Sequence, residues 1–116
     1  MTEVPARIRR IIERYLVELE KNHFPIKRAV VFGSYAEGRA DEWSDIDIAL
    51  VSDAFEGDRF DDRGKIRRIT LSVSSDLSPL PFRPEDFVPE NPLVQEILER
   101  GISIQSERPT PPGSPP

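Results

Sequence analysis

Apolar residues recur along this chain with two different spacings, which predict a helix in some stretches and strands in others. Over residues 6–20 they fall three and four positions apart with charged residues between them, as on an amphipathic helix. Short β-branched runs at residues 29–32 and 46–51 are typical of buried strands. The first half of the chain therefore predicts a scaffold helix that packs on a sheet.

The second half combines weaker patterns with clear turn residues. Residues 52–64 carry aspartates and glycines without periodicity and predict an acidic loop, after which a partial helical pattern resumes over residues 65–73. Residues 73–82 are expected to be extended, at a sheet edge because of their prolines. A capped helix over residues 92–100 and a short strand over residues 102–104 follow. Helices and strands thus surround one small core.

Length and composition limit what the chain can do. Its 116 residues suffice for one domain, expected over residues 1–105. Residues 106–116 are rich in proline and cannot bury apolar surface, so we expect a disordered tail. The absence of cysteine excludes disulfides and zinc–thiolate sites. No stretch is long and apolar enough to span a membrane, and the expected location is cytoplasmic.

The charge balance bears on possible partners. The chain has 16 basic and 21 acidic residues, with a net charge of −5. Recognition of DNA or RNA normally requires a basic surface. The balance therefore argues against nucleic acid as the substrate.

A tight turn follows the first predicted strand, where Gly33 and Ser34 interrupt the apolar run. Glycine allows the backbone to approach a ligand closely, because no side chain stands in the way. Ser34 offers a hydroxyl and a backbone N–H where a helix would begin, and anions are favoured at such a position. Gly33 and Ser34 are therefore candidate phosphate-binding residues.

A pair of carboxylates opens the second predicted strand. Because side chains alternate along a strand, Asp45 and Asp47 lie on one face and Ile46 and Ile48 on the other. Two like charges at this spacing repel each other unless a cation or a proton lies between them. Mg²⁺ binds carboxylate oxygens together with substrate phosphates. The pair therefore predicts a magnesium site.

The combination of Gly33-Ser34, ten intervening residues and Asp45-x-Asp47 resembles the signature of the DNA-polymerase-β-type nucleotidyltransferase superfamily. The small size is similar to that of its minimal branch, the MNT-type domains often encoded beside HEPN-domain toxins. The resemblance extends from the first helix to about Ile104. It implies an α/β fold of the α+β kind, with a small mixed β-sheet packed by helices. It also implies transfer of a nucleoside monophosphate from a nucleoside triphosphate to an acceptor hydroxyl, with release of pyrophosphate.

The resemblance assigns roles to individual residues. Asp45 and Asp47 would hold two Mg²⁺ ions, and Gly33 and Ser34 would hold the β- and γ-phosphates of ATP. Arg39, between these motifs, either binds phosphate oxygens or is a surface arginine.

The sequence departs from the family pattern at the position of a third carboxylate. Minimal members often carry an acidic residue directly before the proline that Pro79 matches, and this chain has Ser78 there. Asp76 lies two positions earlier and on the same face of a strand. It is a candidate third metal ligand and general base, or a solvated turn residue.

These observations leave three hypotheses for the function. The first is an Mg²⁺-dependent enzyme that transfers AMP from ATP to a hydroxyl on a partner protein, as the antitoxin of a HEPN-type toxin. The second is a catalytically weak or inactive antitoxin that neutralises its partner by forming a complex. The third, a small-molecule nucleotidyltransferase, is disfavoured because the helical domain found in such enzymes is missing here.

Overall fold

Four strands form a mixed sheet in the order β3-β2-β1-β4. The computed structural model of the chain describes residues 4–41 and 43–104. Strands β1 and β2 are antiparallel, as are β1 and β4, whereas β2 and β3 are parallel. In chain order the elements are α1 (Ala6–Lys21), β1 (Arg28–Phe32), the 3-10 turn η1 (Gly33–Tyr35), β2 (Ile46–Val51), α2 (Arg59–Val73), β3 (Leu77–Phe82), the 3-10 turn η2 (Pro84–Asp86), α3 (Pro92–Arg100) and β4 (Ile102–Ile104).

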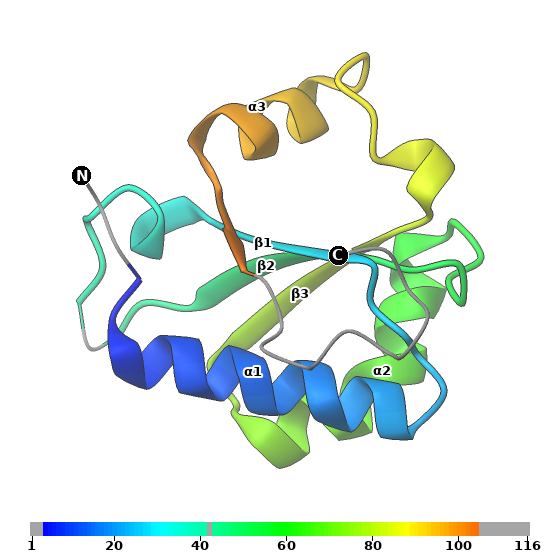
Figure 1. Cartoon of the computed structure of the whole chain (residues 1–116), viewed down its shortest axis with the longest axis horizontal. Helices are drawn as coiled ribbons and strands as arrows, with labels where there is room; N and C mark the ends of the chain where they lie inside the picture. Colours follow the sequence, from blue (N-terminus) through cyan, green and yellow to red (C-terminus); the bar gives the residue numbers. More distant parts are fainter. Residues whose placement is uncertain (1–3, 42, 105–116) are drawn as a thin grey trace, which may run out of the picture.

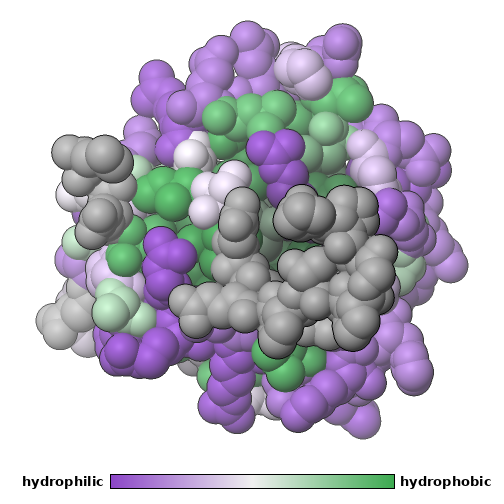
Figure 2. Space-filling model, viewed as in Figure 1, coloured by the Kyte–Doolittle hydropathy of each residue, from purple (hydrophilic) through white to green (hydrophobic). Residues whose placement is uncertain are grey.

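Helices cover both faces of this sheet, which gives three layers (Figure 1). Helices α1 and α2 lie on one face and α3 lies on the other. The alternation of side chains along β2 divides the core in the same way, because Ile46 and Ile48 face α1 and α2 while Ala49 and Val51 belong to the cluster with α3. In one view, hydrophilic residues surround hydrophobic ones that gather in the middle (Figure 2). The fold class expected from the sequence, a mixed sheet packed by helices, is confirmed.

Most of the predicted elements are confirmed, with boundaries within a residue or two. Helix α1 buries the apolar positions that were three and four apart, which are Ile8, Ile12, Tyr15, Leu16 and Leu19. Helix α3 begins after Asn91, whose side chain accepts a hydrogen bond of 2.9 Å from the Leu93 N–H. It ends at Gly101, where a Cβ atom would overlap the Ile97 carbonyl and the Val30 side chain. Any residue can adopt the φ of Gly101, which is −79°. Glycine is favoured here because a side chain would not fit.

The predicted loop over residues 52–64 is wrong in its second half, because α2 already begins at Arg59. The Asp58 side chain caps this helix by accepting a hydrogen bond of 3.1 Å from the Asp61 N–H. Asp62 is fully buried and accepts hydrogen bonds of 3.0 Å from the N–H groups of Glu56 and Gly57. Aspartates that suggested a solvated loop therefore cap a helix and anchor the loop before it.

Strand β3 is an edge strand, as its prolines predicted. The expected extended segment over residues 73–82 begins too early, because α2 continues to Val73 and a turn precedes Leu77. The backbone carbonyls of Asp76 and Phe82 accept hydrogen bonds from β2 and its extension, at 2.8 Å and 3.1 Å. Along a strand, the backbone N–H and C=O groups of successive residues point to opposite sides. Asp76 and Phe82 point theirs toward β2, so the backbone groups of Pro79 and Pro81 point toward the open edge. The edge therefore lacks two of the N–H groups that another strand would need.

The predicted boundary at residue 105 and the tail over residues 106–116 lie outside the described residues. Within the described part, no helix is both long and apolar enough to cross a membrane.

Candidate active site

The end of β1 and the beginnings of β2 and β3 meet at one end of the sheet. Asp47 pairs with Phe32, the last residue of β1, and with Ser78 of β3. Gly33 follows Phe32 directly, and Asp45 precedes the first residue of β2. Because Asp47 alternates with Ile46 and Ile48, its side chain lies on the sheet face that α3 covers. Gly33 of the first motif and Asp47 of the second are therefore neighbours in space.

Gly33 and Asp47 approach each other so closely that glycine is required. Gly33 has a φ of +71°, which L side chains rarely adopt, and a Cβ atom on it would overlap the Asp47 Oδ2 atom. The turn after it is held by the Gly33 carbonyl, which accepts from the N–H groups of Ala36 and Glu37 at 3.1 Å. The half-buried Ser34 follows Gly33 in this turn, so the predicted phosphate-binding turn begins beside Asp47.

The two carboxylates repel each other. Burial, and after it the negative charge of Asp45, raises the pKa of Asp47. Asp47 is half-buried and Asp45 is exposed. None of the ion pairs found in the described part of the chain involves either residue. Two neighbouring carboxylates without a cationic partner suit a hard divalent cation such as Mg²⁺.

Asp76 directly precedes β3, and its backbone carbonyl accepts a hydrogen bond of 2.8 Å from the Ile46 N–H. It is exposed at the start of β3, and its N–H donates to the Ser74 hydroxyl at 3.1 Å. Ser78 is the residue opposite Asp47. Among residues 4–41 and 43–104 no group of three or more histidine, aspartate or glutamate side chains is placed to hold a metal ion. The structure thus brings Asp45 and Asp47 together, and no third acidic side chain of the described residues is grouped with them as a metal ligand.

Arg39 is engaged within the chain. Its guanidinium donates to Glu37 Oε2 at 2.9 Å, and Arg100 of α3 donates to Glu37 Oε1 at 3.2 Å. The hydrogen bond from Arg39 is the main cause that lowers the pKa of Glu37, with a further contribution from Arg100. Arg39 would therefore share its N–H donors between Glu37 and a phosphate.

A cavity of about 240 Å³ opens beside Gly33, between β1 and α3. Its lining includes Glu37 and Arg100, neither of which the sequence indicated as a site residue. These two residues are 63 positions apart, and no local pattern connects them. The full lining is Phe32, Gly33, Glu37, Leu93, Glu96, Ile97 and Arg100.

The four-stranded mixed sheet and the motifs at its end define the class of protein to which this chain is similar. The sequence matches a family described as nucleotidyltransferase domain over residues 9–110. The chain belongs to this family.

Two solved structures share the fold. One is a candidate nucleotidyltransferase from Sulfolobus solfataricus, with a TM-score of 0.63 and 18% identity over 87% of this chain and 82% of that one. The other is a toxin–antitoxin with AMP-PNP, with a TM-score of 0.56 and 21% identity over 83% of this chain and 74% of that one. No curated protein matches the sequence.

Asp47→Asn is expected to stabilise the metal-free chain at neutral pH. The raised pKa means that the folded state holds the Asp47 proton more tightly than the unfolded state does, so ionisation disfavours folding. The amide removes this penalty above the raised pKa. Below the ordinary value of 3.8 both states are protonated, and the substitution changes little. Thermal melts across this pH range should show a higher Tm for the variant only toward neutral pH, and a lower Tm there would contradict the assignment.

Proposed function

We propose that this chain is an Mg²⁺-dependent nucleotidyltransferase that transfers AMP from ATP to a hydroxyl group of a partner protein, as the antitoxin of a HEPN-type toxin. Membership of the nucleotidyltransferase domain family supports the reaction class. The similar fold of a toxin–antitoxin structure with AMP-PNP supports the nucleotide and the kind of partner. Cytoplasmic action follows from this pairing and is part of the proposal.

The contact between Gly33 and Asp47 is the observation that carries this proposal. Gly33, which has no side chain, lies against the carboxylate of Asp47, and the carboxylate of Asp45 is close to that of Asp47. Phosphate requires close access to the backbone, and a metal ion that bridges phosphates requires carboxylate oxygens. Both requirements are met within one small volume, because β1 and β2 are antiparallel neighbours.

In the proposed reaction the acceptor oxygen forms a bond to the α-phosphorus of ATP. The bond from this phosphorus to the oxygen bridging the α- and β-phosphates breaks, pyrophosphate leaves, and the hydroxyl proton passes to a base. Gly33 and Ser34 would hold the β- and γ-phosphates. Asp45 and Asp47 would hold two Mg²⁺ ions, which neutralise charge on the attacking and leaving oxygens when bound.

Asp76 is the proposed base and third carboxylate. Its backbone carbonyl accepts from the Ile46 N–H at 2.8 Å, so it lies beside the start of β2. It is exposed, and proton transfer needs such access to the acceptor. Arg39 has a supporting part at most, since it pairs with Glu37.

A second candidate function is that of an antitoxin that neutralises its partner by binding alone. The observation that favours it is the lack, within the described residues, of a third acidic side chain placed with Asp45 and Asp47. Ser78 lies where a carboxylate would face Asp47. In this case the carboxylate pair would be the remainder of a catalytic site.

Nucleotide binding separates the two candidates. ATP and Mg²⁺ together should raise the Tm more than either alone, because ligands that bind only the folded state stabilise it, by about 2.7 kcal/mol at a hundredfold excess over Kd. Differential scanning fluorimetry with ATP, GTP, CTP and UTP, each with and without Mg²⁺, measures this effect. A Tm that no triphosphate changes would favour the binding module.

A further inference from the structure

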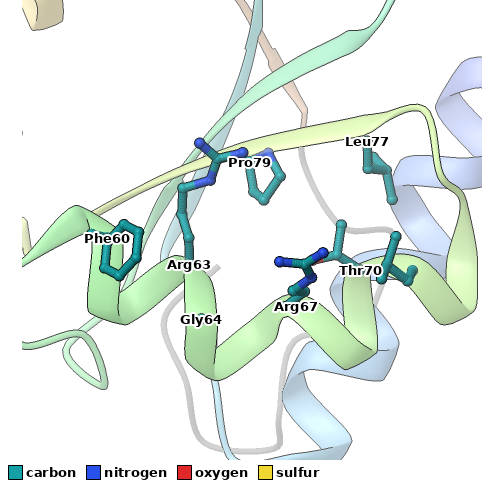
Figure 3. A pocket seen from close by; sticks show the side chains of 8 residues that line it. Phe60, Arg63, Gly64, Arg67, Thr70, Leu77 and Pro79 are labelled. Carbon is teal, nitrogen blue, oxygen red and sulfur yellow. The ribbon is translucent and has the colours of Figure 1, made fainter.

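A groove of about 480 Å³ runs between α2 and the open edge of β3 (Figure 3). Its floor is formed by the buried residues Thr70, Leu77 and Pro79. The Arg63 side chain extends from α2 toward Pro79, and Arg67 rises from the same helix. The groove lies on the sheet face opposite Asp47, so it is distinct from the candidate active site.

Large apolar side chains at the rim of this groove are unusually exposed. Phe60 is 87% exposed and Leu71 is 55% exposed. They lie on one stripe of α2, since Phe60, Gly64, Arg67 and Leu71 follow one another at helical spacing. The buried side of the helix uses other residues, Asp62, Ile66 and Thr70. Such a patch beside an apolar floor is typical of a protein interaction site.

The groove is basic in an acidic chain. Helices α1 and α2 together hold ten basic and five acidic residues, which gives this layer a net charge of +5, although the whole chain carries −5. Among the residues that the structure describes, no acidic one lines the groove. None of the ion pairs found in the described part of the chain involves Arg63 or Arg67. Both guanidiniums are therefore available to carboxylates of a partner.

We propose that this groove docks a segment of a partner protein in which large apolar side chains are flanked by aspartate or glutamate. The apolar floor and rim would receive the apolar side chains, and Arg63 and Arg67 would pair with the carboxylates. Because Pro79 and Pro81 deprive the edge of N–H groups, the segment docks through its side chains and does not extend the sheet. An apolar-lined groove fits protein better than nucleic acid, which calls for a mainly polar and basic surface.

The position of the groove connects it to the proposed reaction. Leu77 in the floor directly follows Asp76, so the groove starts at the end of β3 that lies beside Asp45 and Asp47. A partner held there would be near the candidate active site. This connection rests on the proposed function, whereas the docking itself does not.

Peptide binding to the full chain tests the docking surface. The probe is a short fluorescein-labelled peptide with a Leu-Phe pair between glutamates, and its binding is measured by fluorescence anisotropy. Arg63→Glu with Arg67→Glu should weaken binding at least about tenfold, and Phe60→Ala with Leu71→Ala should have a similar effect. Arg68→Glu, on the same helix but outside the groove, should change the affinity less than about twofold. Arg63→Gln with Arg67→Gln provides a milder pair if charge reversal disturbs the fold.

Three results would overturn the proposal. The first is no binding, or binding that the groove variants leave unchanged. The second is equal or tighter binding of polyglutamate or of a single-stranded RNA oligonucleotide, which would make the site merely electrostatic. The third is sedimentation of the wild type as a dimer that Phe60→Ala with Leu71→Ala dissociates, which would identify the occupant as a second copy of the chain.

The docking surface and the proposed enzyme can fail separately. The effect of ATP and Mg²⁺ on the Tm should be the same in the groove variants and in the wild type. Loss of this effect in the wild type with peptide binding intact would reject the enzyme and leave the groove. The opposite result would reject the groove and leave the enzyme.

Discussion

Asp45→Asn and Asp47→Asn are each expected to reduce the proposed AMP transfer by about 10²–10³-fold while the chain remains folded. In the proposed reaction, charge neutralisation would depend on both carboxylates, and loss of one electrostatic group from such a site commonly reduces turnover by about 10²–10³-fold. Asp47 is half-buried and feels the charge of Asp45, so neither substitution removes a favourable ion pair. Activity should therefore fall, whereas the free energy of unfolding should not decrease.

Transfer from radiolabelled ATP to the partner protein in the presence of Mg²⁺ measures this loss, alongside thermal melts. Asp53→Asn is a matched control, since Asp53 is exposed after the same strand and pairs with Lys27 at 2.7 Å. It should retain full activity. Asp76→Asn should reduce transfer by about 10²–10⁴-fold if Asp76 is the general base. Near-normal activity of Asp45→Asn or Asp47→Asn would refute the metal assignment.

Gly33→Ala is expected to abolish ATP binding. The new Cβ atom would overlap Asp47 Oδ2, and the residue would have to keep a φ of +71°. Either the turn or the carboxylate must then move, and both belong to the candidate site. The backbone strain alone costs about 1–2 kcal/mol. Isothermal titration calorimetry with ATP and Mg²⁺ should show no binding, and wild-type affinity would place the phosphate site elsewhere.

Gly64→Ala is the matched control for this substitution. Gly64 lies in the exposed interior of α2, and a Cβ atom there would meet no atom within 4 Å. Alanine is favoured over glycine in helices by about 0.5–1 kcal/mol, so the free energy of unfolding should rise. ATP binding should not change. Loss of binding in both variants would indicate a general effect of substitution and would remove support for a site at Gly33.

The sequence predicts the centre of the fold because the decisive patterns there are local. Strand periodicity alone identifies the two central strands, in the apolar runs over residues 29–32 and 46–51, and the glycine after the first run marks the turn. Once these two strands are antiparallel neighbours, Gly33 and Asp47 must lie close together. The proximity of the two motifs follows from this pairing, and their roles in binding and catalysis stay predictions.

The start of α2 could not be predicted in this way. Aspartates are depleted in helix interiors and common in loops, so residues 58–62 indicated a loop. In the structure, Asp62 is buried because the N–H groups of Glu56 and Gly57 point at its carboxylate. That stabilisation depends on the conformation of a neighbouring loop, which helical periodicity does not show.

Sequence reasoning did not identify Glu37 and Arg100 in the candidate site, because only long-range contacts bring them there. Glu37 and Arg100 meet only because α3 packs over the end of β1. The groove beside β3 likewise combines residues of a helix and a strand. Asp76 remains a prediction, since its role depends on distances that the sequence cannot fix. Charge alone also misled about surfaces, because a net charge of −5 conceals a basic layer formed by α1 and α2.

The most direct measurement of the central claim compares ATP labelled at the α-phosphate with ATP labelled at the γ-phosphate. Each is incubated with the wild-type chain, Mg²⁺ and the toxin of the proposed pair, and the proteins are separated by gel electrophoresis. Nucleotidyl transfer moves the α-phosphate to the acceptor and releases the γ-phosphate in pyrophosphate. We expect the toxin to be labelled from α-labelled ATP only, with Mg²⁺ required. Label from the γ-phosphate, or no label on the toxin while it is fully neutralised, would contradict the account.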